Sequence, residues 1–274
     1  MSFEAEGFLS TDLTGWIDRH RTKHSTWFSL AGDLNLVLQS CVRSMMIQSD
    51  DNASFVASLL FMRGLSGFQG SIILAERGMT LEARTLARAC FETLFYLAAL
   101  QKDPSFVDEM IAEDAAQRKK IARALAELPD SAGLDAARID RLRTFILEVG
   151  TSGENVKAIG IESAAKRAGL HEIYNTYYRG LSNDSAHPSL PAMNRHTDLD
   201  PNGEVIGLKW TPGAQDISDT LSVICTTGVY LAAVALELFG VKEAPVQLEA
   251  IWETYKRLID EVELLAGPEG ISNT

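Results

Sequence analysis

The chain has 274 residues and a formal net charge of −12. A chain of this length buries about three-quarters of the surface that its unfolded form exposes, so it needs no disulfide or metal to hold a core together. The charge argues against broad, charge-driven binding to nucleic acid or anionic lipid, because the field of the whole molecule repels both. No cofactor-binding motif is present, and we expect no cofactor.

The cysteines and the N-terminal residues indicate the cellular compartment of the protein. Cys41, Cys90 and Cys225 are odd in number, lie far apart in apolar sequence and lack the close Cys/His spacing of a zinc site. We therefore expect reduced core thiols. The first residues carry acids and no apolar run, so we expect no signal peptide there. Together these features predict a cytoplasmic protein.

Apolar residues at helical spacing run through the chain, and Gly, Pro and capping residues separate the periods. We predict an all-α fold, one domain over residues 1–274 built as a bundle of about nine or ten helices. The glycine-rich turn around residues 150–160 is the one plausible seam. In chain order, we expect helices over Ser10–Thr22, Thr26–Ser49, Asn52–Arg77, Thr80–Lys102, residues 104–128 after the N-cap Asp103, Asp135–Val149, Glu162–Ala168, His171–Ser182, Asp216–Phe239 and Pro245–Ala266.

Two segments test this helical scheme. Residues 193–199 and 204–210 look extended, and the Asp-Pro-Asn-Gly sequence between them is turn chemistry, so we expect an inserted β-hairpin at about residues 193–210. Leu221–Leu236 carries no charge and is just short of the usual membrane-spanning length. Thr226, Thr227 and Gly228 in its middle suit close packing, so we expect a buried core helix and no membrane span.

The expected third helix contains Gly64, Gly67 and Gly70. Each glycine costs about 1 kcal/mol in a helix relative to alanine, so three in two turns need a packing reason. We expect a groove in which another helix approaches closely. A phosphate-binding glycine loop is the alternative, but it needs a preceding strand that the sequence does not predict.

Two basic clusters lie on helical patterns whose other faces are apolar, so we expect both to be solvated faces. They are Arg19-His20-Arg21-Thr22-Lys23-His24 and Arg118-Lys119-Lys120 with Arg123.

Charged residues also occur on the apolar fourth helix. Arg84, Arg88 and Glu92 follow one another at four-residue intervals and so form one stripe. Isolated buried charge is costly, so these side chains must pair or line a polar cavity. In the structural interpretation, an Arg88–Glu92 ion pair fixes the register of neighbouring helices. In the functional one, the stripe is the floor of a site that Arg63 and Glu76 could join.

The segment from Tyr177 to Ser189 is the richest in polar side chains that can bind an anion or move a proton. Helical periodicity buries Tyr177 and Tyr178, turns Arg179 towards solvent or a second subunit, and leaves Ser182 at the boundary. Pro188 disfavours helix at His187, which we expect on a loop over the helix C-terminus.

His187 is either a capping residue or a functional one, since Ser182, Asn183, Asp184 and Ser185 can all orient it. We predict a ligand-binding site beneath this loop, for a small anion or a partner protein. A metal site is the weaker alternative, because the spacing of Asp184, His187, His196 and Asp198 matches no standard ligand motif. A serine nucleophile, Ser182 or Ser185, is weaker still. The predicted ligand-binding residues are Arg84, Arg88, Glu92, Ser182, Asp184 and His196, with no metal ligand.

Two motifs together resemble a bacterial family of helical proteins of unknown function. They are Arg84-x3-Arg88-x3-Glu92 and Leu181-Ser182-Asn183-Asp184-Ser185-Ala186-His187-Pro188-Ser189. The likeness runs from about the third helix to the penultimate one. It implies a fold and the location of a site, but no activity.

A more distant similarity is to HEPN ribonucleases of toxin and phage-defence systems, through Arg179, Asn183 and His187 in that order. Seven residues separate the arginine from the histidine, more than in the HEPN motif. The resemblance implies a dimer with the motif at its interface, where the histidine moves a proton and the arginine steadies the phosphate of RNA. The leading prediction is a dimeric module that binds a ligand or partner without catalysis, and the alternative is a metal-independent ribonuclease.

Overall fold

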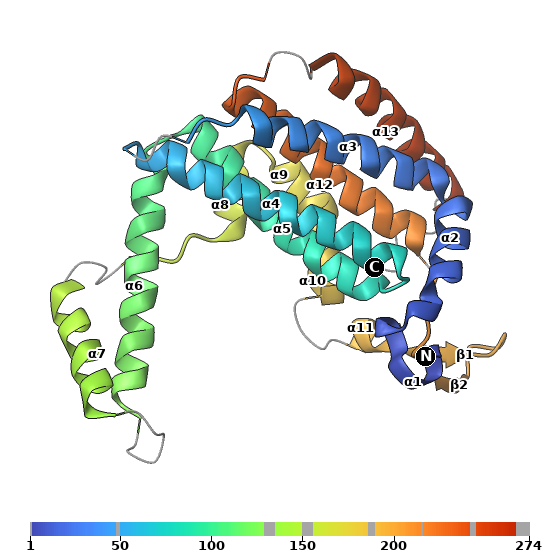
Figure 1. The fold of residues 1–274 in the computed structure, drawn as a ribbon, viewed down its shortest axis with the longest axis horizontal. Helices are drawn as coiled ribbons and strands as arrows, with labels where there is room; N and C mark the ends of the chain where they lie inside the picture. The colour runs from blue at the N-terminus through green and yellow to red at the C-terminus, as the bar shows by residue number, and fades with distance from the viewer. Residues whose placement is uncertain are drawn as a thin grey trace.

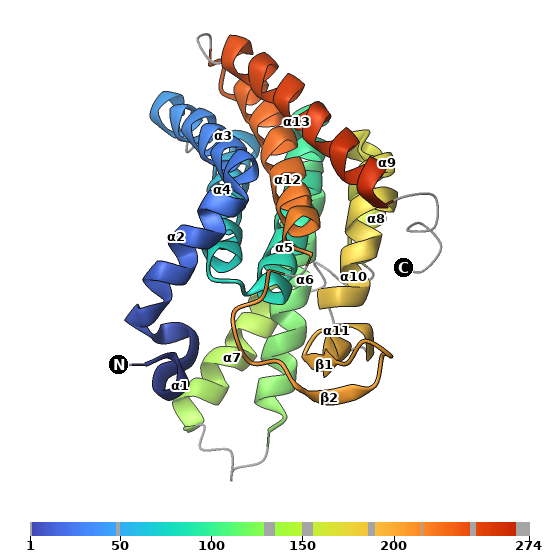
Figure 2. The same ribbon diagram turned by 90° about the vertical axis from the view of Figure 1, so that its right-hand side faces the viewer.

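The structure is a computed structural model that describes residues 2–47, 50–128, 135–149, 156–185, 190–214, 216–241 and 245–266. Over these residues the fold is all-α with one two-stranded antiparallel hairpin, as the sequence predicts (Figure 1). Helices α3, α4, α5 and α13 pack around α12, while α1, α11 and the hairpin gather at one end of the bundle (Figure 2).

The elements follow in chain order, with η1 and η2 as 3-10 turns and η4 as a π-helical turn. They are α1 Phe3–Glu6, η1 Gly7–Leu9, η2 Thr11–Leu13, α2 Thr14–Lys23, α3 Ser25–Ser44, α4 Asn52–Glu76, α5 Thr80–Lys102, α6 Phe106–Ala126, α7 Ala136–Val149, α8 Ile161–Ala168, α9 His171–Ile173, η4 Tyr174–Tyr178, α10 Arg179–Ser185, α11 Leu190–Asn194, β1 Thr197–Leu199, β2 Val205–Leu208, α12 Ile217–Leu238 and α13 Pro245–Ala266.

Several boundaries differ from the sequence prediction. The N-terminal segment forms α1 and two 3-10 turns before α2, and α3 ends at Ser44, where Met45 turns extended. Residues 104–105 precede α6 because the Asp103 carboxylate accepts hydrogen bonds from the Ser105 amide, at 3.1 Å, and from its hydroxyl, at 2.6 Å. That local turn delays the helix to Phe106.

The hairpin is shorter than expected. Residues 190–194 form α11, so extended structure begins only at Thr197. Thr197 pairs with Leu208 and Asp198 with Gly207, and the register shifts between Asp198 and Leu199. The Asp200 carboxylate accepts backbone hydrogen bonds from Asn202 and Glu204, as expected for a turn built by an aspartate side chain.

The core lies where α3, α4, α5 and α12 meet. Helices α4 and α12 are long and apolar enough to cross a membrane by length and composition, a test that core helices also pass. In α12, 72% of the most apolar window is buried inside the fold, against 39% in α4. The segment Leu221–Val229 is buried throughout, which agrees with the core helix that the sequence predicts.

The glycines of α4 are the points of close helix approach, as the sequence indicates. A Cβ at Gly67 would lie 2.5 Å from Cys90 Sγ, and a Cβ at Gly70 would lie 2.7 Å from Leu86 Cδ2, both on α5. At Gly64 the nearest neighbour is Leu231 of α12, at 3.1 Å. The three cysteines, Cys41, Cys90 and Cys225, are free and buried, as expected.

The two basic clusters are only partly solvated faces, which corrects the prediction. His20 is 4% exposed and Lys119 is 4% exposed, because α2 and α6 turn these side chains inward. Arg118, Lys120 and Arg123 are exposed as expected. Helix α6 leaves the bundle and α7 packs beside it, so the pair projects from the remaining helices (Figure 1).

Candidate functional site

The charged stripe on α5 leads from an ion-paired cluster to a cavity. We call the cluster around Arg88 and Glu92 the paired half of the stripe, and the cavity beyond Arg84 its open half. Arg88 and Glu92 lie where η4 and α10 cross α5, and Arg84 lies one turn nearer the N-terminal end of that helix. Beyond Arg84, the first turn of α5 opens into a cavity.

Arg88 is the centre of the paired half. Its NH1 lies 2.7 Å from Glu92 Oε1, its NH2 donates to the Tyr178 hydroxyl at 2.6 Å, and its Nε donates to Ser182 Oγ at 3.4 Å. The guanidinium also lies over the Tyr178 ring, 4.7 Å from its centroid. The structural interpretation of the stripe, an Arg88–Glu92 ion pair that joins neighbouring helices, agrees with these contacts.

Tyr178 completes this cluster. Its hydroxyl donates to Glu92 Oε1 at 2.9 Å while accepting from Arg88. Burial and the bond to Glu92 raise the pKa of Tyr178 to about 12, so its proton stays in place at neutral pH. The group that links the two charges is therefore a fixed hydrogen-bond bridge and has no proton to exchange near pH 7.

The π-helical turn explains how Tyr178 reaches α5. The helix expected over His171–Ser182 contains η4, in which the backbone bonds widen by one residue. The Tyr174 and Tyr178 rings stack at 5.1 Å between centroids, and Tyr178 meets Phe95 of α5 at 5.9 Å. Arg179, the next residue, is exposed, as the sequence predicts.

Arg84 forms a second link along the stripe. Its side chain is 9% exposed and pairs with Asp219 in the first turn of α12. Arg88 and Arg84 thus anchor α10 and α12 to the same face of α5. Glu76, which the sequence suggests as a further member, is instead paired with Arg21, and Arg63 is exposed.

The open half is a cavity of about 530 Å³ at the N-terminal end of α5. Hydrogen bonds join three segments there: Gly213 N donates to Gly78 O at 3.1 Å, and the Arg77 guanidinium donates to the Phe8 carbonyl at 3.2 Å. Gly78 has a φ of +72°, and a Cβ on it would lie 2.8 Å from Gly213 N, so only glycine fits this junction.

Charged side chains of both signs and an aromatic wall line this cavity. Arg195 donates to Asp216 at 2.7 Å, and His196 and Lys209 lie beside it at the base of the hairpin. Trp210 is 56% exposed and stacks on Phe3, with 5.5 Å between centroids. The lining combines the cations Arg195 and Lys209 with the carboxylates Glu82 and Asp216 and a flat apolar surface.

The predicted site residues therefore divide into three sets. Arg88, Glu92 and Ser182 come together as expected, Arg84 lies one turn away, and His196 lies in the cavity rather than at the cluster. His187 and the side chains of Asn183 and Asp184 lie outside the described residues. Among the residues described, no three His, Cys, Asp or Glu side chains form a metal-binding group.

Sequence reasoning missed five contributors, namely Tyr178, Asp219, Arg195, Lys209 and Trp210. Helical phase places Tyr178 on the buried face but does not indicate what its hydroxyl meets. Asp219 could have been recognised from the sequence, because a carboxylate in the first turn of an otherwise apolar helix indicates a charged partner. Arg195 and Trp210 flank the hairpin and come together only through its pairing.

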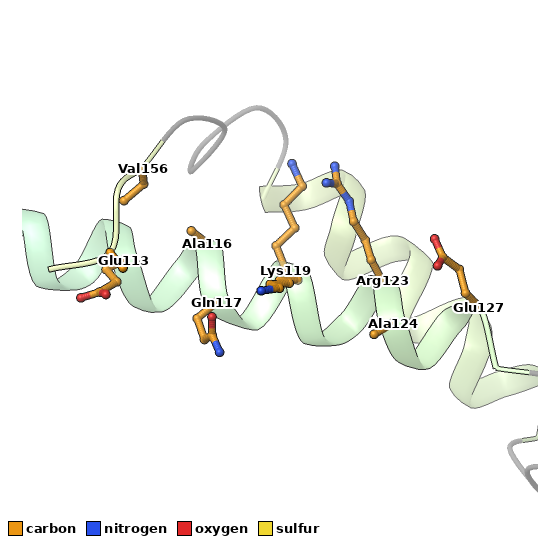
Figure 3. A pocket seen from close by; sticks show the side chains of 10 residues that line it. Glu113, Ala116, Gln117, Lys119, Arg123, Ala124, Glu127 and Val156 are labelled. Atoms are coloured by element: carbon orange, nitrogen blue, oxygen red, sulfur yellow. The ribbon is translucent and has the colours of Figure 1, made fainter. Parts of the chain in front are cut away.

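A second cavity, of about 770 Å³, lies along α6, with Val156 on the chain that returns beside it (Figure 3). Its charges are mixed: Lys119 and Arg123 follow Glu113 along the helix, and Glu127 comes one turn later (Figure 3). It shares no residue with the α5 stripe or its cavity.

Comparison with curated proteins and with solved structures finds no match. Residues 54–205, more than half of the chain, match a family described as a family of unknown function, DUF5677. The matched region contains the α5 stripe, Tyr178, Ser182 and His196, whereas Lys209 and Trp210 lie just beyond it. The chain therefore belongs to the DUF5677 family of unknown function.

Proposed function

We propose that the chain is a non-catalytic module that binds a small anionic ligand in the cavity at the N-terminal end of α5. The observation that carries this proposal is the convergence of Arg195, His196 and Lys209 beside Trp210. Arg195 and Lys209 favour an anion at this place, whereas the net charge of −12 disfavours anionic polymers elsewhere on the chain.

The lining indicates the chemistry of the ligand. Arg195 is oriented by Asp216, and a guanidinium is the side chain best suited to a carboxylate or phosphate. Trp210 offers a flat face to an apolar or aromatic portion. The volume lies in the range of small-molecule sites, so we infer a small anion with a planar apolar part.

The paired half of the stripe supports binding over catalysis. Arg88, Glu92 and Tyr178 form hydrogen bonds and an ion pair with one another. Because the pKa of Tyr178 is high, its hydroxyl has no role in proton transfer at neutral pH. Their role in this proposal is to hold α10 against α5, next to the ligand-binding end of that helix.

The test is a thermal-shift and calorimetric titration with a panel of phosphorylated and carboxylated aromatic compounds, such as nucleoside monophosphates, with inorganic phosphate as the probe for charge alone. A ligand of the proposed class should raise Tm and bind one site per chain. Lys209→Gln and Trp210→Ala should each weaken that binding by about tenfold, which is ~1.4 kcal/mol.

Lys120→Gln on α6 is the matched control, because Lys120 is exposed and lies outside this cavity. It should leave binding unchanged. A panel without any binder, or a binder equally affected by Lys120→Gln and Lys209→Gln, would contradict the proposal.

A second candidate is the HEPN-like ribonuclease, which one observation favours. Helix α10 runs from Arg179 to Ser185, so Arg179 and Asn183 occupy positions four apart in one helix, and Arg179 is exposed. That placement suits a motif shared across a dimer interface.

This candidate is tested with labelled RNA in EDTA, alongside His187→Ala and Arg179→Ala, with light scattering to determine the oligomeric state. The ribonuclease proposal expects a dimer whose cleavage is lost in both variants and kept in Arg143→Ala, an exposed arginine of α7. Cleavage absent throughout, or equal in all four proteins, would exclude it.

A further inference from the structure

A histidine pair at the junction of α2 and α3 has no role in the site described above. His20 lies in the last turn of α2 and His24 immediately follows that helix. The His24 amide donates to the His20 carbonyl at 3.1 Å, so helical spacing continues through both residues. Side chains four apart in a helix share a face, which is the spacing used by paired histidine ligands of metals.

Both rings present a buried nitrogen without a hydrogen-bond partner. His20 is 4% exposed, and the Nε2 atoms of His20 and His24 are both buried without a partner among the described residues. Buried polar atoms are nearly always satisfied, and exceptions call for an explanation such as an ion. Two such atoms on neighbouring rings point to a shared partner.

The spacing of the rings fits a metal ion. Their centroids lie 5.1 Å apart with 58° between the planes. Two imidazoles bound to one tetrahedral ion at ~2.0–2.1 Å per nitrogen would have centroids about 5 Å apart. The observed centroid separation is therefore close to the one that two imidazoles on one ion would have.

The surroundings set the tautomer of His20. Since Nε2 of His20 has no partner among the described residues, its hydrogen bond with the Ala75 backbone involves Nδ1, and the lone pair stays on Nε2. A lone pair on Nε2 is what a metal ion needs from this ring.

The nearby charges limit which ions fit. Arg21 is paired with Glu76 and lies over Phe28, and Lys23 is a neighbouring cation that opposes a metal. Ions held mainly by charge, such as Mg²⁺ and Ca²⁺, are disfavoured by Lys23 and by the absence of oxygen ligands from the pair. Imidazole nitrogen instead suits Zn²⁺, Cu²⁺ and Ni²⁺.

We propose that His20 and His24 form a two-histidine site for a transition-metal ion of the Zn²⁺, Cu²⁺ or Ni²⁺ class, with water completing its coordination. The site joins the end of α2 to the start of α3. It shares no residue with the α5 cavity, so it stands or fails independently of the proposed function.

The experiment uses the full chain without a histidine tag, stripped of metal and titrated with Zn²⁺ and Cu²⁺ by calorimetry at pH 7.5. We expect one ion per chain, a Kd on the order of micromolar for two neutral imidazoles opposed by one lysine, and a higher Tm with Zn²⁺ but not with Mg²⁺. The electron paramagnetic resonance spectrum of the Cu²⁺ form should show coupling to two nitrogens.

Histidine variants distinguish metal binding at this site from metal binding at other histidines. His20→Gln and His24→Gln should each weaken binding at least tenfold and leave a single coupled nitrogen, while circular dichroism verifies that they fold. His24→Gln is the safer variant, since His24 is only partly buried. His171→Gln, at an exposed histidine on α9, is the control and should bind normally. No stoichiometric binding, or equal binding in all variants, would overturn the proposal.

Discussion

At the scale of single residues, one hydroxyl group joins the two charges of the α5 stripe. Tyr178 is 6% exposed, accepts from Arg88 and donates to Glu92. Arg88 and Glu92 are partly solvated, with side chains 23% and 33% exposed, so their own ion pair contributes little in water. The buried hydroxyl, by contrast, makes both of its bonds away from solvent.

Tyr178→Phe should therefore lower the free energy of unfolding by about 1–2 kcal/mol, since the ring packing remains and two hydrogen bonds are lost. Urea denaturation measures the change. Tyr174→Phe is the matched control, because the Tyr174 ring stacks in the same row and its hydroxyl makes no hydrogen bond among the described residues. Equal losses in the two variants would show that the bridge has no special role.

The same hydroxyl predicts an alkaline limit to stability. The pKa of Tyr178 rises from an ordinary value of 10.0 to about 12, so its contribution is complete below pH 10 and is lost as pH rises to 12. Tyr96 and Tyr255 also have raised pKa values, so the comparison of interest is the difference between wild type and Tyr178→Phe. This difference should shrink between pH 10 and pH 12, and a constant difference would contradict the assignment.

At the scale of elements, small residues decide how closely α4 can approach its neighbours. In α4, Gly67 lies against Cys90 and Gly70 against Leu86 of α5. Helix propensity alone would favour alanine at these positions, so packing outweighs propensity where the helices touch.

Gly67→Ala should destabilise the protein by about 1–3 kcal/mol, because its Cβ would lie 2.5 Å from Cys90 Sγ in a filled core. Gly32→Ala in α3 is the matched control, since nothing lies within 4 Å of a Cβ there and Gly32 is exposed. It should stabilise by up to about 1 kcal/mol. Chemical denaturation of both variants gives the sign, and a neutral Gly67→Ala would mean that α4 and α5 can separate without cost.

At the scale of the whole molecule, helix boundaries were predictable from local sequence patterns, whereas contacts between residues far apart in the sequence were not. The predicted and observed bounds of α5 and α13 are identical, because apolar periodicity and the residues at the helix ends define both helices. The pairing of Arg84 with Asp219 joins residues 135 positions apart, and the α5 cavity needs Phe8, Gly78 and Gly213 to meet. Such contacts depend on how helices pack, which no single helix pattern contains. The π-helical turn was also missed, because it occurs within a continuous helical period.

The arrangement of the helices also predicts a gradient of local stability. Helix α12 buries most of its side chains between α3, α4 and α5, whereas α7 has no buried residue and, within the described part of the chain, packs mainly on α6. A helix opens locally when the apolar area that it buries is small, so amide exchange should be fast in α7 and slowest in α12 and α5. Hydrogen exchange followed by mass spectrometry measures this directly. We expect α7 to be labelled within minutes at pH 7 while α12 exchanges only through global unfolding, and equal protection of the two would mean that α7 is held by contacts beyond those to α6.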